Sequence, residues 1–176
     1  MRSFAIILVL ALAVFANGAS AAPPKPDVIY VVTPQSVVDA MLDMAKVGPG
    51  DVLYDLGSGD GRIPITAAKR FGVRSVGIEI DVALVREASR QARRQRVDHL
   101  VSFRKADLFT TDLSEASVVT LYLLDTVNLR LRPKLLSELK PGTRVVSHAF
   151  HMGDWKPDEV REVDDNMIYL WTIPPR

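Results

Sequence analysis

The chain is predicted to fold as an α/β domain with a mostly parallel, doubly wound sheet and an antiparallel hairpin at its C-terminal end. Three observations predict this class. Short apolar segments of strand length alternate with amphipathic segments of helix length through most of the chain. The first strand, Val52 to Leu56, runs directly into a turn rich in glycine. The last two strand-like segments are separated by only three polar residues, which is hairpin spacing.

The first 22 residues are predicted to lie outside the fold. One arginine precedes an apolar run, Phe4 to Ala16, and small residues follow up to Ala22. This pattern is typical of a secretory signal peptide, so we expect export to the periplasm or beyond. As an alternative, residues 3–22 would stay uncleaved and anchor the protein in a membrane. Residues 23–29, with three prolines, are predicted to form a stiff linker before a domain at 30–176.

Composition limits the classes of function. The 176 residues are 48% hydrophobic, enough for one domain with a core but not for two. The net charge of +1 gives no overall field that would draw the protein to nucleic acid, so no nucleic-acid partner is expected. The chain has no cysteine, which excludes disulfides and thiolate chemistry. We expect a monomer.

Thr33 and Pro34 begin the first predicted helix, which continues to Lys46 and ends at a Gly-Pro-Gly sequence. Each later element carries apolar residues at the spacing of a strand or a helix. These elements are a helix at 62–71, a strand at 74–80, a helix at 82–96, strands at 100–105 and 117–124, a helix at 128–139, a strand at 143–148, and the hairpin strands 159–163 and 167–173.

The predicted helix at 82–96 carries five arginines. They are Arg86, Arg90, Arg93, Arg94 and Arg96. Nucleic-acid-binding surfaces interleave such cations with aromatic residues that stack on bases, and this segment has none. The stripe is therefore interpreted as the solvent-facing side of a helix whose alanines face the sheet.

The turn after the first strand is the strongest indication of a binding site. Its glycines are Gly57, Gly59 and Gly61 in the sequence DLGSGDGR. They sit where a strand meets a helix, so a ligand can approach bare backbone. A dinucleotide fingerprint needs its third glycine at the position of Arg62, and Asp55 and Asp60 would repel a pyrophosphate. The turn favours a nucleotide-like ligand with a cationic end, and an NAD-dependent oxidoreductase is the less favoured alternative.

Further acidic residues follow the next strands. Glu79 ends the second strand about twenty residues beyond the glycine turn, where a carboxylate accepts hydrogen bonds from ribose hydroxyls. Asp107 follows the third strand. Acids at such places are also helix caps or turn formers, which is the alternative for each. Because parallel strands end at one edge of a sheet, one crevice is expected to gather Asp60, Glu79, Asp107, Asp125 and His148.

The order D-x-G-x-G-x-G after an apolar strand resembles motif I of the class I S-adenosylmethionine-dependent methyltransferases, whose fold is Rossmann-like. From Tyr30 onward the chain is similar to small bacterial methyltransferases. These are related to the mitochondrial protein-lysine methyltransferases of the adenine nucleotide translocator and the ATP synthase c subunit. The similarity is carried by DLGSGDGR, by TLYLLDTVNLRLRPKLLSELKPGTRVVSH and by FHMGDWKPD.

This resemblance implies S-adenosylmethionine as cofactor and methyl transfer to an amine, with a protein lysine as the candidate acceptor. It implies that Asp107 faces the adenine amino group and that Thr33 closes over the cofactor. The cofactor-binding set is expected to be Thr33, Asp55, Gly57, Ser58, Gly59, Gly61, Glu79, Ile80, Asp107 and Leu108. The chain departs from the family at Asp125, where a proline is usual, and at Ala149, where an acid is usual. A non-catalytic, exported S-adenosylmethionine-binding protein is the alternative that these departures leave open.

Asp125 and His148 are the candidate catalytic residues, since either side chain can orient an incoming amine or accept its proton. Their structural alternatives are a helix cap and a hydrogen-bonded histidine at a strand end. The segment at Asp125 lacks the Asn/Asp-Pro-Pro-aromatic sequence of enzymes that methylate DNA adenine or glutamine. His148, His151 and Asp154 are not expected to bind a metal, because the two histidines, three residues apart in an extended segment, point to opposite faces.

Overall fold

The structure is a computed structural model that describes residues 31–176. The predicted signal peptide or anchor and the linker at 23–29 lie outside the described residues. Within the part of the chain that is described, no helix has the length and apolar character needed to cross a membrane.

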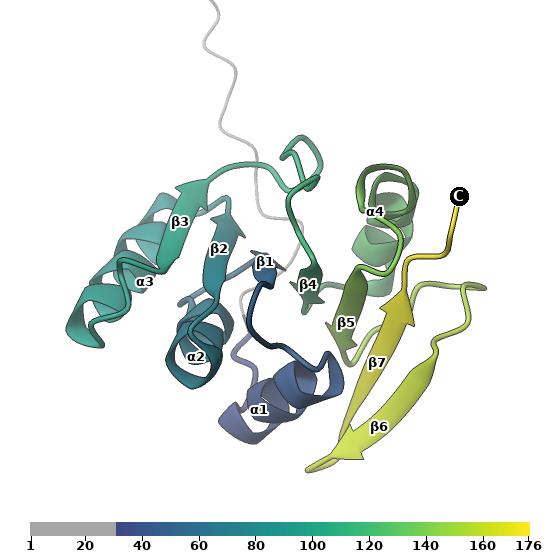
Figure 1. Ribbon diagram of the computed structural model, residues 1–176, viewed down its shortest axis with the longest axis horizontal. Coiled ribbons are helices and arrows are strands. Elements are labelled where there is room, and N and C mark those ends of the chain that lie inside the picture. Colours follow the sequence, from purple (N-terminus) through teal and green to yellow (C-terminus); the bar gives the residue numbers. More distant parts are fainter. Residues whose placement is uncertain (1–30) are drawn as a thin grey trace, which may run out of the picture.

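Seven strands form one sheet in the order β3-β2-β1-β4-β5-β7-β6 (Figure 1). The strands are β1 (Val52–Leu56), β2 (Arg74–Glu79), β3 (Val101–Lys105), β4 (Val118–Leu121), β5 (Arg144–His148), β6 (Glu159–Val163) and β7 (Asn166–Thr172). Strands β1 to β5 pair in parallel, whereas β7 pairs antiparallel with both β5 and β6. The predicted fold class, a mostly parallel α/β sheet with a C-terminal antiparallel hairpin, is confirmed.

Helices cover both faces of the sheet. They are α1 (Gln35–Met44), α2 (Arg62–Phe71), α3 (Val82–Arg94) and α4 (Asp125–Glu138). Helices α1, α2 and α3 lie on one side of the sheet and α4 on the other (Figure 1). The chain order reverses direction between β1 and β4, and a crevice is expected outside the carboxyl ends of the strands at such a switch point.

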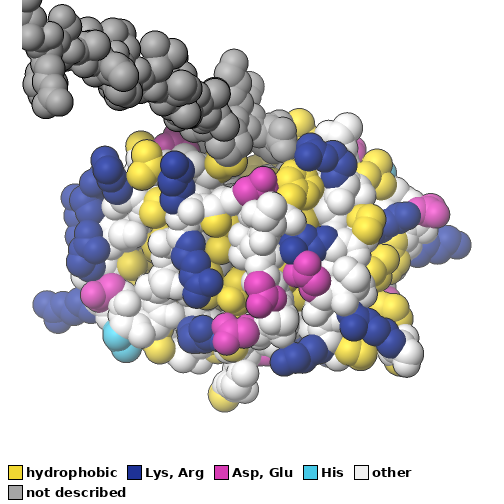
Figure 2. All heavy atoms as spheres, turned by 90° about the horizontal axis from the view of Figure 1, so that it is seen from above, with side chains coloured by type: hydrophobic (Ala, Val, Ile, Leu, Met, Phe, Trp, Pro, Cys, Tyr) yellow, Lys and Arg dark blue, Asp and Glu magenta, His cyan; other side chains and the backbone are white. Residues whose placement is uncertain are grey.

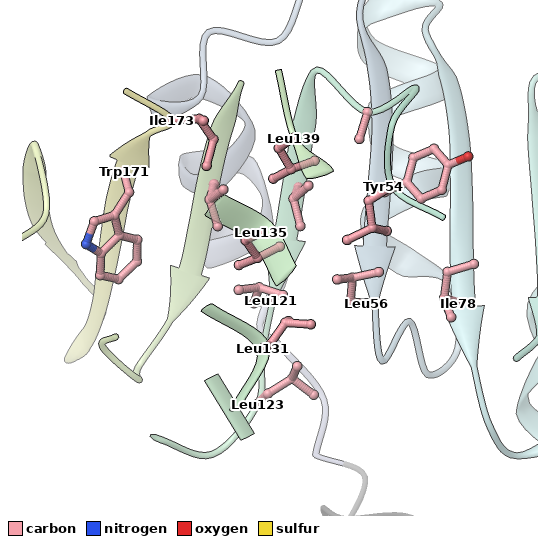
Figure 3. Packing of buried hydrophobic residues seen from close by; sticks show 14 of the residues in the cluster. Tyr54, Leu56, Ile78, Leu121, Leu123, Leu131, Leu135, Leu139, Trp171 and Ile173 are labelled. Atoms are coloured by element: carbon pink, nitrogen blue, oxygen red, sulfur yellow. The ribbon is translucent and has the colours of Figure 1, made fainter. Parts of the chain in front are cut away.

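The core has one layer on each face because neighbouring residues of a strand point to opposite sides. In β1, Leu53 packs towards α1 and α2, and Tyr54 packs towards α4. Figure 3 shows the second layer, in which Leu131 and Leu135 of α4 meet the sheet and Trp171 closes the end near the hairpin. The indole N–H of Trp171 donates to a backbone carbonyl 2.8 Å away, so its one polar atom is satisfied inside the core.

Most element boundaries agree with the sequence prediction to within one or two residues, but the β4–α4 junction does not. Strand β4 ends at Leu121 rather than 124, and α4 begins at Asp125 rather than 128. The carbonyl of Leu124 accepts the N–H groups of Val127 and Asn128, both at 2.9 Å, so helical bonding starts there. The apolar Leu123-Leu124 pair was interpreted as strand, although Leu124 is an exposed N-cap residue.

The ring of Phe103 in β3 packs against two glycines. A Cβ atom added to Gly77 of β2 would lie 2.4 Å from this ring and 2.6 Å from the hydroxyl of Ser58. A Cβ on Gly61 would lie 2.3 Å from the same ring. These glycines therefore make room for Phe103, which joins the glycine turn to the edge strand.

Replacement of Gly77 by alanine is expected to lower the free energy of unfolding by about 1–3 kcal/mol, because the new methyl group must displace Phe103 or Ser58. Gly48→Ala is the matched control, since a Cβ there meets only one atom, at 3.9 Å. Its effect is expected to stay within about 1 kcal/mol of zero. Urea denaturation of both variants tests this, and equal midpoints would contradict it.

Candidate functional site

A cavity of about 660 Å³ opens at the carboxyl ends of β1, β2 and β4. Eight residues of the sequence-predicted binding set line it, namely Thr33, Asp55, Gly57, Ser58, Glu79, Ile80, Asp107 and Leu108. Gly59 and Gly61 do not line the cavity, but they shape the turn that forms its floor. Gly61 takes a left-handed conformation with φ of 80° as the N-cap of α2, which favours glycine at this position.

The carboxylate of Glu79 joins two turns of the chain. Its Oε2 accepts the N–H of Gly59 at 3.0 Å, and its Oε1 accepts those of Ile80 and Asp81 at 2.7 and 2.9 Å. A carboxylate has about four acceptor positions. Three are used by backbone donors, so Glu79 keeps room for one more hydrogen bond from a ligand hydroxyl in the cavity.

Asp55 lies buried at the end of β1, where Thr120 donates a hydrogen bond of 2.7 Å to its Oδ1. Burial raises the pKa of the Asp55 carboxyl to about 7. The Thr120 hydrogen bond opposes this rise, and the nearby carboxylates of Glu79 and Asp60 add to it. The Asp55 carboxyl therefore ionises near neutral pH. A cation in the cavity would stabilise its charged form.

Asp107 follows β3 and lines the cavity. Its Oδ1 accepts the N–H of Phe109 at 2.8 Å, which leaves Oδ2 for a ligand. The turn-forming and the ligand-binding interpretations of Asp107 are thus compatible, because different oxygens serve them.

A short segment from the N-terminal side closes one wall of the cavity. Val31 and Val32 line the cavity beside Thr33. The carbonyl of Thr33 accepts a hydrogen bond of 2.9 Å from Arg62, which also forms an ion pair of 2.6 Å with Asp60. The first turn of α2 therefore holds this segment against the cavity.

His148 does not line the cavity. It is buried, with Nδ1 3.3 Å from the hydroxyl of Thr33 and Nε2 3.1 Å from the Asn166 side-chain oxygen. Its ring lies 3.9 Å from that of Tyr122, centroid to centroid, and Tyr122 does line the cavity. Burial lowers the pKa of His148, so the ring is neutral at pH 7. In this geometry His148 contacts Thr33 and Tyr122 on the side away from the cavity. A direct catalytic role for His148 stays a prediction.

Asp125 does not line the cavity, contrary to the expectation. It is half-exposed in the first turn of α4, next to the cavity-lining residues Leu123 and Val127. Its Oδ1 is buried and has no hydrogen-bond partner. The nearest cationic candidate is Nδ1 of His151 at 3.7 Å, but that nitrogen accepts the N–H of Gly153 at 3.1 Å and so does not donate. A buried oxygen without a donor is costly, and a bound amine would supply one.

Tyr122 and Arg130 are among the cavity-lining residues that were not predicted from the sequence. Tyr122 lies directly after β4, and its place at a strand end was the available signal. Arg130 of α4 lies over the ring of Phe109, 4.2 Å from its centroid, and reaches the cavity from across the crevice. Nothing local in the sequence indicates that approach. Between residues 31 and 176, no three His, Asp or Glu side chains come together in a way that would hold a metal ion.

The comparisons with known proteins agree on one family. The family model described as the ANTKMT methyltransferase domain matches residues 55–159. A protein-lysine N-methyltransferase of Saccharolobus islandicus is 52% identical over 84% of this chain and 95% of its own length. The adenine nucleotide translocase lysine N-methyltransferase of Mus musculus is 35% identical over 86% of this chain, and the match covers 66% of that enzyme's length.

Among solved structures, an RNA methyltransferase from Salinibacter ruber in complex with S-adenosyl-L-homocysteine superposes with a TM-score of 0.82. It is 56% identical, and the match covers 83% of this chain and 95% of that one. The names of these relatives differ in the methyl acceptor and agree on methyl transfer. They lend no support to an oxidoreductase or to a non-catalytic binding protein.

The pKa of Asp55 makes the stability of the ligand-free protein depend on pH. Because the folded pKa of about 7 lies above the ordinary value of 3.8, the folded protein binds a proton that the unfolded chain has released between these pH values. The stabilisation that this bound proton gives the folded state is fully present below about pH 4 and is lost as the pH rises through 7. Relative to Asp55→Asn, the free energy of unfolding of the natural protein is expected to fall by up to about 1.4 kcal/mol per pH unit. Urea denaturation between about pH 5 and 8 measures it, and parallel curves would contradict it.

Proposed function

The chain belongs to the ANTKMT methyltransferase domain family and is an S-adenosylmethionine-dependent methyltransferase, and from this premise we propose that its acceptor is the ε-amino group of a lysine in a protein. The charge of the cavity carries the proposal. Five acidic side chains line it, namely Asp55, Asp60, Glu79, Asp81 and Asp107, against the two arginines Arg62 and Arg130. A lysine is attracted to such a cavity, whereas the phosphates of a nucleic acid are repelled.

The residues of the cavity fit S-adenosylmethionine. The free acceptor position of Glu79 suits a ribose hydroxyl, and the Oδ2 of Asp107 suits the adenine amino group. The buried carboxyl of Asp55 suits the cationic amino-acid end, because a nearby positive charge favours its ionised form. We assign these three contacts to the members Glu79, Asp107 and Asp55 of the cofactor-binding set, with the glycine turn as the floor.

When bound, the cofactor supplies a methyl group on a positively charged sulfur, which is reactive towards a neutral amine. The protein's task is to hold the amine in line with that methyl group, and positioning alone provides a large part of such an acceleration. Tyr122, fixed from behind by His148, walls the cavity where the amine must enter.

Asp125 is assigned to the acceptor amine. A lysine has a pKa near 10.4 and carries a proton at neutral pH, so that proton must leave before the nitrogen can react. The unpartnered Oδ1 of Asp125 accepts a hydrogen bond from the incoming ammonium and orients it as the proton leaves towards water. The family resemblance implies a proline at this position, so the contact would be particular to this chain.

The acceptor class is tested by methylation with S-adenosylmethionine labelled in its methyl group, using a protein extract and a total RNA preparation as separate acceptors. Label that a protease releases, and that appears as Nε-methyllysine after acid hydrolysis, is the expected result. Label that enters RNA and is released by nuclease would overturn the lysine proposal and favour the activity named for the Salinibacter ruber relative.

The assignment of Asp107 to the adenine has a matched control in the chain. Asp107 and Asp112 each accept the backbone N–H two residues later, at 2.8 and 2.9 Å, but only Asp107 lines the cavity. Asp107→Ala is expected to weaken S-adenosylhomocysteine binding about 10- to 100-fold, and Asp112→Ala to leave it within about twofold. Isothermal titration calorimetry measures both dissociation constants. Equal affinities would remove Asp107 from the binding set.

Asp125→Asn is expected to lower kcat/KM for lysine methylation about 10- to 100-fold, because the variant loses the charge that binds the ammonium. The dissociation constant for S-adenosylhomocysteine is expected to stay unchanged, since Asp125 lies outside the cofactor set. Steady-state kinetics and calorimetry of the same preparation separate the two effects. Unchanged kinetics would reduce Asp125 to a residue of the α4 N-terminus.

A further inference from the structure

One edge of the molecule carries a charge opposite to that of the rest. Residues 82–105, which form α3 and the edge strand β3, hold seven basic and two acidic residues, a net charge of +5. The other 152 residues hold 15 basic and 19 acidic residues, a net charge of −4. Figure 2 shows Lys and Arg side chains along its left edge, the side on which Figure 1 places α3 and β3.

The arginines of α3 form one surface. Positions 86, 90, 93 and 94 fall on one side of the helix, opposite the buried Ala88 and Ala92. We call this surface, with Arg96 just beyond the helix, the arginine face; all five of its side chains are exposed. Arg90 and Arg94 pair with Glu87. Arg86, Arg93 and Arg96 have no ion-pair partner in residues 31–176, so most of the charge is not neutralised within the domain.

We propose that the arginine face binds the anionic surface of a lipid membrane. Each arginine near such a surface strengthens binding about fivefold, and a row of them on one helix acts together. The N-terminal end of α3 lies at the cavity, which Asp81 and Leu84 line. Val82, the first residue of α3, is exposed one turn before Arg86. An apolar residue next to a basic stripe suits the boundary between lipid headgroups and acyl chains.

Two further observations favour lipid over nucleic acid as the partner. The only aromatic residue of 82–105 is Phe103, and its ring is packed against Gly61 and Gly77, so it is not available to stack on bases. The same chain carries the apolar run Phe4 to Ala16. An apolar segment and a basic surface in one chain are the two signals that together give stable membrane association.

Membrane binding by this face has a consequence for the cavity. Val31 and Val32 line the cavity and are 57% and 43% exposed, so the mouth also carries apolar side chains on its outer rim. With the arginine face on the lipid, Val82 lies close to the membrane surface, and so does the part of the cavity that Asp81 and Leu84 line. The proposal goes beyond the proposed function and does not rest on it, because lipid binding is measured without an acceptor.

The test is flotation of the full-length protein with vesicles of phosphatidylcholine alone or with 30% phosphatidylglycerol. The natural protein is expected to bind the anionic vesicles at least about tenfold more tightly, and this preference is expected to vanish in 0.5 M salt. Equal binding to both kinds of vesicle at low salt would overturn the proposal, since the apolar N-terminal segment alone would then account for it.

A triple variant, Arg86→Glu with Arg93→Glu and Arg96→Glu, is expected to lose the preference for anionic vesicles. Lys46→Glu with Lys140→Glu and Lys156→Glu makes the same change in net charge at exposed sites outside this face and is expected to keep the preference. Unchanged S-adenosylhomocysteine binding shows that each variant is folded. Equal losses in both triple variants would overturn the proposal, and so would salt-sensitive RNA binding through the arginine face without a preference for anionic vesicles.

Discussion

The carboxylate of Glu79 is the contact on which the cavity depends. It joins the glycine turn after β1 to the turn after β2 through three backbone N–H groups, and these two turns form adjacent walls of the same cavity. Without it, Gly59, Ile80 and Asp81 would each need another acceptor at the carboxyl edge of the sheet. The parallel sheet places the strand ends together, and this one side chain fixes the backbone between them at hydrogen-bond distance.

The cavity concentrates negative charge at a cost to the fold. Asp55 is buried near Glu79 and Asp60, and it would destabilise the empty protein if it were fully ionised. Its raised pKa relieves this repulsion by proton uptake, and a cationic ligand relieves it by charge pairing. The basic residues of α3, of β3 and of the loop between them balance the total charge without lining the cavity. Opposite charges thus occupy different places in a chain whose net charge is only +1.

Features that depend on local pattern were predictable from the sequence. The strand β1, the glycine turn and the position of Glu79 follow from spacing along the chain, and eight of the ten predicted binding residues line the cavity. Features that depend on contacts between residues far apart in the sequence were not predictable. His148 lies behind Tyr122 because α1 and the segment at Thr33 pack over the end of β5, and the unpartnered oxygen of Asp125 depends on which donor His151 meets. The β4–α4 boundary was missed because two leucines fit a strand and a helix N-cap equally well by hydrophobicity.

The antiparallel insertion at the end of the chain has a consequence for biosynthesis. Strand β7 lies between β5 and β6, so β6 has no neighbour in the sheet other than β7, although it is synthesised earlier. The edge of β5 and the whole of β6 remain unpaired while the chain emerges, and Trp171 has not yet closed the core. A nascent chain that is complete through β6 but lacks β7 therefore still presents an open sheet edge, which is a form that chaperones bind.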